Sequence, residues 1–291
     1  MTDANRLYFQ ESPGLLSQYC RALLARGQRH PSPQLPGLEG WLTCIHANPA
    51  KVRAYAEVCG FNLSGTELPI TYPHLLAFPL HMELMLHKSF PLPLIGLVHI
   101  RNHITQHRPL SLHDKLDIRC TFAGLQPTEK GLEFDIRTEI SCAGELLWES
   151  ISTNLSRRNN RKSRAFIYQP PLTFQQQQTW SMAENLGRKY ARVSGDANPI
   201  HLFALSARLS GFPRHIAHGM WTKARAAATL YPLLHSGRCQ LTTEFKLPVF
   251  LPAEVQLHWN EMNQTTLPGT DFELRSDDGS KTHLKGKIAA F

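Results

Sequence analysis

Alternating apolar and polar positions predict two separate series of β-strands. In the first half of the chain, this period-two pattern marks four segments: 96–107, 115–125, 131–142 and 145–156. In the second half it marks four more: 238–247, 254–263, 270–276 and 281–290. Turn-forming residues at Glu129–Gly131, Ala143–Gly144 and Asp277–Ser280 separate neighbouring segments. The pattern therefore predicts two antiparallel sheets.

Helical spacing of apolar residues predicts elements before each strand series. Apolar residues recur with this spacing over about 14–26, and a second helix is predicted from the Asn48-Pro49 cap to Cys59. In the second half, Gly219 opens an alanine-rich run to Leu234 that is typical of a helix. The apolar run Leu68–Leu80 is interpreted as a loop. Each half is thus expected to wrap its sheet around a central helix.

The two halves also align with each other. Tyr55–Phe61 matches Tyr190–Asp196, and Arg108–Leu116 matches Leu247–Val255, at separations of about 135 and 139 residues. Such repetition indicates an internal duplication. The first copy has Phe61 in place of the acid, and no Asn-Pro-x-His follows it. We expect this copy to keep the fold without the chemistry.

The stretch from Ser194 to His201 brings an acid and a base close together. Asn198 followed by Pro199 predicts a helix start, because Asn caps free N–H groups and Pro fits the first helical position. His201 then falls in the first turn, with Asp196 in the loop before the cap. Since a helix N-terminus disfavours imidazolium, we expect His201 to be neutral and able to accept a proton.

A second segment, Ile216–Met220, offers hydrogen-bond donors. The first N–H groups of the helix that starts at Gly219 lack partners inside the helix, so a substrate carbonyl can accept from them. His218 is interpreted as support beside Gly219, and Asn198, His218 and Met220 as residues that position the substrate. An acid, a base and backbone donors suit removal of a proton beside a carbonyl, with loss or gain of water.

The run 194–201 resembles the signature of the MaoC-like dehydratases, also called (R)-specific enoyl hydratases or hydratase 2. Ala207 stands where that signature has a small residue, and His215 departs from the Pro that the family more often has. Two other segments also look like family segments: Ile216–Met220 and Phe245–Phe250. The resemblance is good over about 180–260. It implies a hotdog fold and reversible hydration of enoyl thioesters. It further implies that Asp196 and His201 are catalytic and that Gly219 is in the oxyanion hole.

The duplication and the resemblance together predict an α+β double hotdog, in which two hotdog domains pair as a pseudo-dimer. We expect an N-terminal extension over 1–40, a degenerate non-catalytic hotdog domain over 41–160 and a catalytic domain over 161–291. The protein would then be a monomeric pseudo-dimer or a homodimer. The degenerate copy would leave room for the acyl chain.

The composition of the chain indicates which cellular compartment and which binding partners to expect. Six scattered cysteines form no Cys-x-x-Cys pair, which favours reduced thiols in the cytoplasm. No apolar run approaches the ~20 residues that a membrane span needs. The net charge is +8, with one basic cluster at Arg157–Arg164. Because no zinc-finger or RNA-binding motif accompanies this cluster, nucleic acid is not expected as a partner. The cluster is either a solvated linker or a surface that attracts an anionic carrier, coenzyme A or acyl carrier protein.

Three other functions were weighed. His201, His215 and His218 could be drawn as metal ligands, but no Cys or carboxylate completes the set, so neither a metal nor another cofactor is expected. A hotdog acyl thioesterase is a closer alternative. A non-catalytic acyl-thioester binding module is the alternative from another class, disfavoured because the second copy retains every reactive position.

Overall fold

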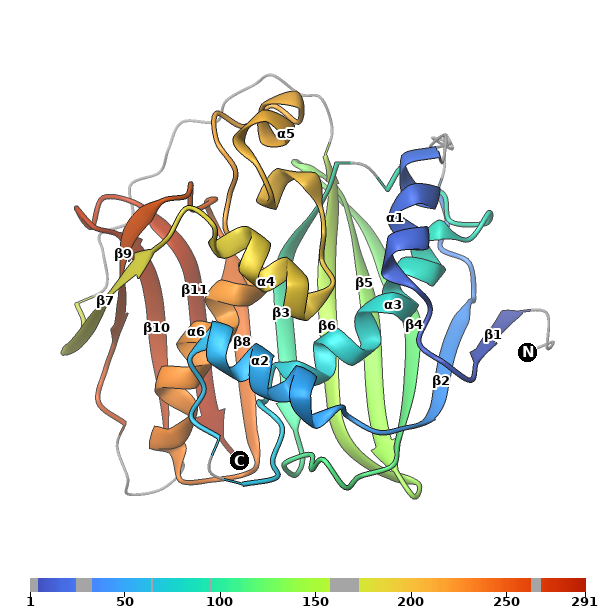
Figure 1. Ribbon diagram of the computed structural model, residues 1–291, viewed down its shortest axis with the longest axis horizontal. Helices are drawn as coiled ribbons and strands as arrows, with labels where there is room; N and C mark the ends of the chain where they lie inside the picture. Colours follow the sequence, from blue (N-terminus) through green and yellow to red (C-terminus); the bar gives the residue numbers. More distant parts are fainter. Residues whose placement is uncertain (1–4, 25–32, 64, 95, 158–172, 263–267) are drawn as a thin grey trace.

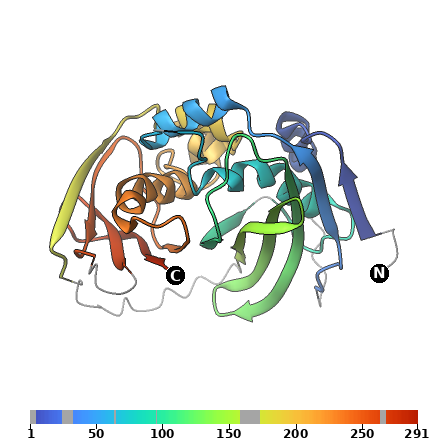
Figure 2. The ribbon, with the colours of Figure 1, turned by 90° about the horizontal axis from the view of Figure 1, so that it is seen from below.

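The computed structural model describes residues 5–24, 33–63, 65–94, 96–157, 173–262 and 268–291. Within this part of the chain, eleven strands form one curved sheet with the helices on its inner face (Figures 1 and 2). The strand order is β1-β2-β4-β5-β6-β3-β8-β11-β10-β9-β7. Every neighbouring pair is antiparallel except β1 and β2, which run parallel.

The strands have these bounds: β1 Arg6–Phe9, β2 Glu39–Ile45, β3 Leu97–Gln106, β4 Leu116–Thr128, β5 Gly131–Cys142, β6 Glu145–Arg157, β7 Gln176–Met182, β8 Cys239–Phe245, β9 Ala253–Trp259, β10 Gly269–Ser276 and β11 Thr282–Ala290. The helices are α1 Leu15–Leu24, α2 Pro49–Cys59, α3 Tyr72–Leu86, α4 Leu186–Ser194, α5 Ala204–Leu209 and α6 Gly219–Leu230, with 3₁₀ turns η2 Pro199–His201 and η3 Tyr231–Leu234. All eight strands expected from alternation are present, and β1, β2 and β7 are additional.

The sheet repeats one arrangement twice. Read outward from the centre, the first copy gives β3-β6-β5-β4-β2 and the second gives β8-β11-β10-β9-β7. The two copies meet where β3 pairs with β8, from Arg101 opposite Glu244 to Gln106 opposite Cys239. This symmetry confirms the predicted α+β double hotdog. The boundary expected near residue 160, and most of the basic cluster after Arg157, lie outside the described residues.

Helices α2 and α4 are the clearest pair of equivalent elements. They lie side by side across the seam between the two copies, and the rings of Tyr55 and Tyr190 are 6.1 Å apart (Figure 1). Gly60 and Gly195 cap their C-termini with φ of 78° and 75°. This left-handed conformation costs glycine least, so both copies keep glycine there. The aligned stretches 55–61 and 190–196 are therefore the same structural turn.

The interpretation of Leu68–Leu80 as a loop is wrong from Tyr72 onward, because helix α3 starts there. This helix is buried in the core and is largely apolar around its circumference. It therefore lacks the one-sided apolar pattern that identifies surface helices. Pro73 stands in its first turn, where no N–H is needed, and Pro79 lies inside the helix. His81 also lies inside α3, well after the start of the helix at Tyr72.

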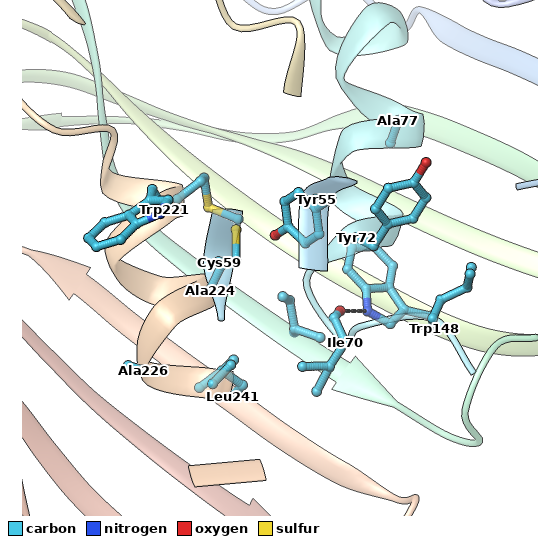
Figure 3. Close-up of a cluster of buried hydrophobic side chains, with 14 of the residues drawn as sticks. Tyr55, Cys59, Ile70, Tyr72, Ala77, Trp148, Trp221, Ala224, Ala226 and Leu241 are labelled. Atoms are coloured by element: carbon cyan, nitrogen blue, oxygen red, sulfur yellow. Dashed lines mark hydrogen bonds between the residues drawn. The ribbon is translucent and has the colours of Figure 1, made fainter. Parts of the chain in front are cut away.

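A shared core joins the two copies (Figure 3). The indole of Trp148 donates to the carbonyl of Ile70 over 2.9 Å within the first copy. Trp221, on α6 of the second copy, donates to the carbonyl of Val58 over 2.9 Å. Both rings are almost fully buried and keep their polar N–H satisfied.

In the described part of the chain, no helix is long and apolar enough to cross a bilayer.

Candidate active site

The turn from Asp196 to His201, called the acid–base corner below, follows directly after α4. Gly195 turns the chain, and Asp196 comes next. Asn198 caps η2, because its side chain accepts from the Ile200 N–H over 3.4 Å. The Asn198 N–H in turn donates to Oδ1 of Asp196 over 3.2 Å. The capping role expected for Asn198 is thus observed, and the cap also holds one oxygen of the carboxylate.

His201 is buried at the end of this corner, with 8% of its surface exposed. Its Nδ1 lies 2.8 Å from the carbonyl oxygen of Ile216, which only accepts, so Nδ1 carries the proton and Nε2 is a free acceptor. Burial holds the pKa of His201 below its ordinary value, against the opposing effects of Asp196 and the Ile216 carbonyl. The predicted neutral state holds, but its reason changes. His201 ends a three-residue 3₁₀ turn, so burial and not a helix dipole keeps it neutral.

His218 lies directly against His201. The two rings stack with centroids 3.8 Å apart and an angle of 26° between them. Nε2 of His218 donates to the backbone oxygen of Asp196 over 3.0 Å. Burial, and next the neighbouring His201, lower the pKa of His218 to about 3. A neutral His218 therefore contacts both members of the pair, and its role in positioning the substrate stays a prediction.

Asp196 is held in its ionised form. Its side chain keeps 30% of its surface exposed. Burial would raise its pKa. The neighbouring His218 and His201 and the hydrogen bonds from Tyr19 and the Asn198 N–H outweigh this and hold the pKa below its ordinary value. An ionised carboxylate and a neutral imidazole thus lie within 4.8 Å of each other.

Contrary to the expectation that no carboxylate completes a histidine set, Asp196, His201 and His218 each offer a ligand atom, and these atoms lie within 4.8 Å of one another. His215, the third histidine of the set considered from sequence, instead has Nε2 2.7 Å from the carbonyl of Glu184. Imidazole lone pairs lie in the ring plane, so two rings stacked 3.8 Å apart do not aim both lone pairs at one ion.

We therefore expect dialysis of the purified protein against EDTA to leave its turnover within about twofold. The measurement is the hydration rate before and after dialysis, with and without added Zn²⁺. Loss of activity that Zn²⁺ restores would make this trio a metal site.

Gly219 begins α6 and has His218 as its N-cap. The N–H groups of Trp221 and Thr222 already donate to the His218 carbonyl. No acceptor for the Gly219 N–H lies among the residues that the structure describes. This N–H is thus available to a substrate oxygen beside the acid–base corner.

A cavity of about 110 Å³ adjoins the corner. Asp196 and Met220 line it from the second copy, and residues of α3 and of strands β3, β5 and β6 line it from the first. Met220, expected to position the substrate, is on this wall. The degenerate copy therefore contributes part of the space next to the corner, as the duplication suggested.

Tyr19, on α1, is a site residue that sequence reasoning missed. Its hydroxyl donates to Oδ1 of Asp196 over 2.7 Å. Leu15, on the same helix, packs directly on Gly195. A Cβ added to Gly195 would come within 2.1 Å of Cδ1 of Leu15. The apolar spacing predicted the helix but not its target. The only available signal was the tyrosine itself, because a buried hydroxyl needs a partner.

Gly187 is a second residue near the site that the sequence did not point to. A Cβ at this position of α4 would come within 1.9 Å of the backbone oxygen of His201. The absence of a side chain therefore lets α4 pack directly on the turn that carries the base. Nothing in the local sequence distinguishes this glycine from others in a helix.

The double-hotdog sheet and the nearby Asp196 and His201 were compared with known protein families. The family described as MaoC like domain matches residues 166–273. The chain is 32% identical over 260 residues to "3-hydroxyacyl-thioester dehydratase X" of Mycobacterium tuberculosis, covering 88% of this chain and 90% of that protein. The chain therefore belongs to the MaoC-like dehydratase family.

Two further comparisons agree with this membership. The crystal structure of HtdX from Mycobacterium tuberculosis has 32% identity and a TM-score of 0.73, covering 86% of this chain and 98% of that one. "Enoyl-CoA hydratase 2, peroxisomal" of Arabidopsis thaliana is 32% identical over 146 residues, or 43% of this chain and 46% of that protein. A double-hotdog protein of Mycobacterium tuberculosis, at 14% identity and a TM-score of 0.55, covers 96% of this chain and 98% of that one and shows the fold alone.

The degenerate copy provides a test of what the corner requires. Phe61 follows Gly60 as Asp196 follows Gly195, but a phenyl ring supplies neither acid nor base, and no Asn-Pro-x-His follows it in the sequence. We expect Phe61→Asp, introduced into Asp196→Asn protein, to restore no activity. The measurement is the enoyl hydration rate of the double variant against Asp196→Asn alone. Recovery of turnover would mean that the first copy retains a working site.

Proposed function

We propose that this protein catalyses the reversible dehydration of (3R)-3-hydroxyacyl thioesters to trans-2-enoyl thioesters, with Asp196 and His201 as the catalytic pair. The observation that carries the proposal is the ionised Asp196 carboxylate on the cavity wall, with the neutral imidazole of His201 within 4.8 Å of it and a free N–H at Gly219. The activities named for the relatives support the same reaction.

The protonation states favour a definite division of labour. Neutral His201 takes the proton from the carbon beside the thioester through Nε2. The electron pair moves to the thioester oxygen, and the Gly219 N–H stabilises the negative charge that develops there. Asp196 accepts a hydrogen bond from the 3-hydroxyl and stabilises the imidazolium of His201. The proton then passes from His201 to the departing hydroxyl on the same face, which releases water and forms the double bond.

Product analysis tests the reaction. Purified protein is mixed with a trans-2-enoyl-CoA, and the enoyl absorbance and the free thiol are followed together. We expect the absorbance to fall without thiol release, and the product to be the 3R isomer. Thiol release would indicate a thioesterase, and binding without any change in absorbance would indicate a binding module.

The carrier is either coenzyme A or acyl carrier protein, and both are anionic. The net charge of +8 supports attraction of either one. Parallel assays of the same acyl group on both carriers, at low and high salt, decide between them.

Tyr19 is expected to hold Asp196 in place. With Oδ1 occupied by the Tyr19 hydroxyl and the Asn198 N–H, Oδ2 is left for the substrate. Tyr19→Phe removes one hydrogen bond to a charged group, so we expect turnover to fall about tenfold. The same loss makes the ionised form of Asp196 less favourable and raises its pKa, so the acid side of the pH profile of kcat/KM moves to higher pH.

A matched control for Tyr19 is Tyr8→Phe, which alters an exposed tyrosine near the same end of the chain. We expect Tyr8→Phe to leave both the rate and the profile unchanged. Reduced activity of Tyr19→Phe with an unmoved pH profile would assign Tyr19 to packing of α1 alone.

A further inference from the structure

Three histidines of the first copy line the same cavity as Asp196. His74 and His81 come from α3, and His99 comes from β3. The ring of His74 is 5.4 Å from that of His81 and 5.9 Å from that of His99. An alkyl chain needs only apolar walls, so this histidine cluster requires a separate explanation.

The cluster has hydrogen-bonding capacity that the described residues do not use. Nδ1 of His74 and Nε2 of His99 are buried and have no partner in the described part of the chain. His74 is 93% buried, as its exposed fraction of 7% implies. His81 differs, because its Nε2 is 2.7 Å from Oγ1 of Thr138. Unpaired buried nitrogens are unfavourable, so this wall is suited to a ligand atom or a water that completes them.

The charge state of the cluster restricts that ligand. Burial lowers the pKa of His81 to about 3 and that of His99 to about 4, and holds the pKa of His74 well below its ordinary value. Lys223 is the neighbouring cation, but its Nζ already donates to Oδ1 and the carbonyl of Asn102 and to the carbonyl of Leu241. Its three donors are used. Burial also holds the pKa of Lys223 well below its ordinary value. The described residues that line the cavity include no Lys or Arg, and Asp196 on the same wall is an anion, so a buried carboxylate is disfavoured there, whereas a neutral oxygen can pair with the unused histidine nitrogens.

The position of the cluster fixes which part of the substrate would meet it. Phe245 packs on Gly219, since a Cβ at Gly219 would come within 2.9 Å of its ring. The centroid of the His99 ring is 5.2 Å from that of the Phe245 ring. The histidines are thus one aromatic ring away from the place where the thioester oxygen is proposed to bind, on the side of the first copy.

We propose that His74 and His99 bind a neutral oxygen, a hydroxyl or a keto group, on the acyl chain several carbons beyond the reacting centre. The inference rests on the proposed function and names its substrate class: oxygen-bearing 3-hydroxyacyl and enoyl thioesters in preference to plain alkyl ones. When the cavity holds water, an oxygen on the substrate reproduces the hydrogen bonds that the water makes, and a methylene does not. This difference is the source of selectivity.

The test compares matched trans-2-enoyl-CoA substrates of equal chain length, with an alkyl tail or with one hydroxyl or keto oxygen placed in turn at carbons 5 to 8. For wild type we expect kcat/KM at the best position to exceed that of the alkyl substrate about tenfold. His74→Phe and His99→Leu should bring the ratio to one or below while activity on the alkyl substrate stays within about threefold. Thermal melting accompanies each variant, and the wild-type ratio remains decisive if a variant does not fold.

Two controls separate hydrogen bonding from shape. Phe78→Leu alters the same wall without a polar group, so it should change both substrates together and keep their ratio. His113→Gln alters an exposed histidine and should change neither. Equal turnover of both substrates by wild type would overturn the inference. An equal loss on both substrates in the histidine variants would assign the cluster to the carrier arm or to folding. Absence of turnover on every substrate would instead refute the proposed function.

Discussion

Asp196→Asn and His201→Ala are each expected to lower the turnover of an enoyl thioester by about 10²–10⁴, the range for lost acid–base catalysis. Asn at position 196 keeps the size of the side chain and an oxygen for the Tyr19 hydroxyl, but it loses the negative charge that stabilises a protonated His201. Ala at position 201 removes the neutral base, whose Nε2 is free to accept because Nδ1 donates to the Ile216 carbonyl. The measurement is kcat on a soluble enoyl-CoA.

The stacking of His201 on His218 makes a folding control necessary for the second variant, because Ala leaves a gap against that ring. Thermal melting should place both variants near the wild type. Asp271→Asn and His113→Ala change exposed residues of the same types and should retain full activity. If either site variant folds properly and works at a near-normal rate, the pair has been wrongly assigned.

Much of the fold could be predicted from sequence because its elements carry local signals. Strands β4, β8 and β9 alternate between buried and less buried positions over much of their length, and the period-two sequence pattern records this alternation. The duplication was readable because the Gly60 and Gly195 turns demand glycine in both copies. Helix α3 could not be read in the same way, since burial on all sides removes the amphipathic pattern.

The residues of the candidate site also fall into two groups, those with a local sequence signal and those without one. Asp196, Asn198 and His201 are close in sequence, so a single turn brings them together and spacing alone predicts them. Tyr19 reaches Asp196 from 177 residues away, and no local pattern records a contact at that separation. The histidine cluster also depends on tertiary packing, since α3 and β3 bring together residues that neither periodicity nor motif connects.

Gly219 is expected to matter for two reasons, and one pair of variants separates them. From sequence, a helix-start glycine should accept a side chain without loss of folding. The structure corrects this expectation, because a Cβ at Gly219 would come within 2.9 Å of Cδ1 of Phe245. A contact below 3 Å forces the ring to move. Gly219→Ala should therefore lower the melting temperature, and it should also lower turnover by about 10²–10³ if the Cβ obstructs the approach of the thioester oxygen.

Phe245→Leu in the same chain relieves the contact with the new Cβ without reopening the space in front of the Gly219 N–H. We expect the double variant Gly219→Ala/Phe245→Leu to recover much of the melting temperature and little of the turnover, while Phe245→Leu alone stays active. Recovery of both quantities together would mean that Gly219 serves packing against β8 and that the thioester oxygen binds elsewhere. Continued loss of turnover in a refolded double variant would leave the obstructed N–H as its cause, because the acid–base corner is unchanged in both proteins.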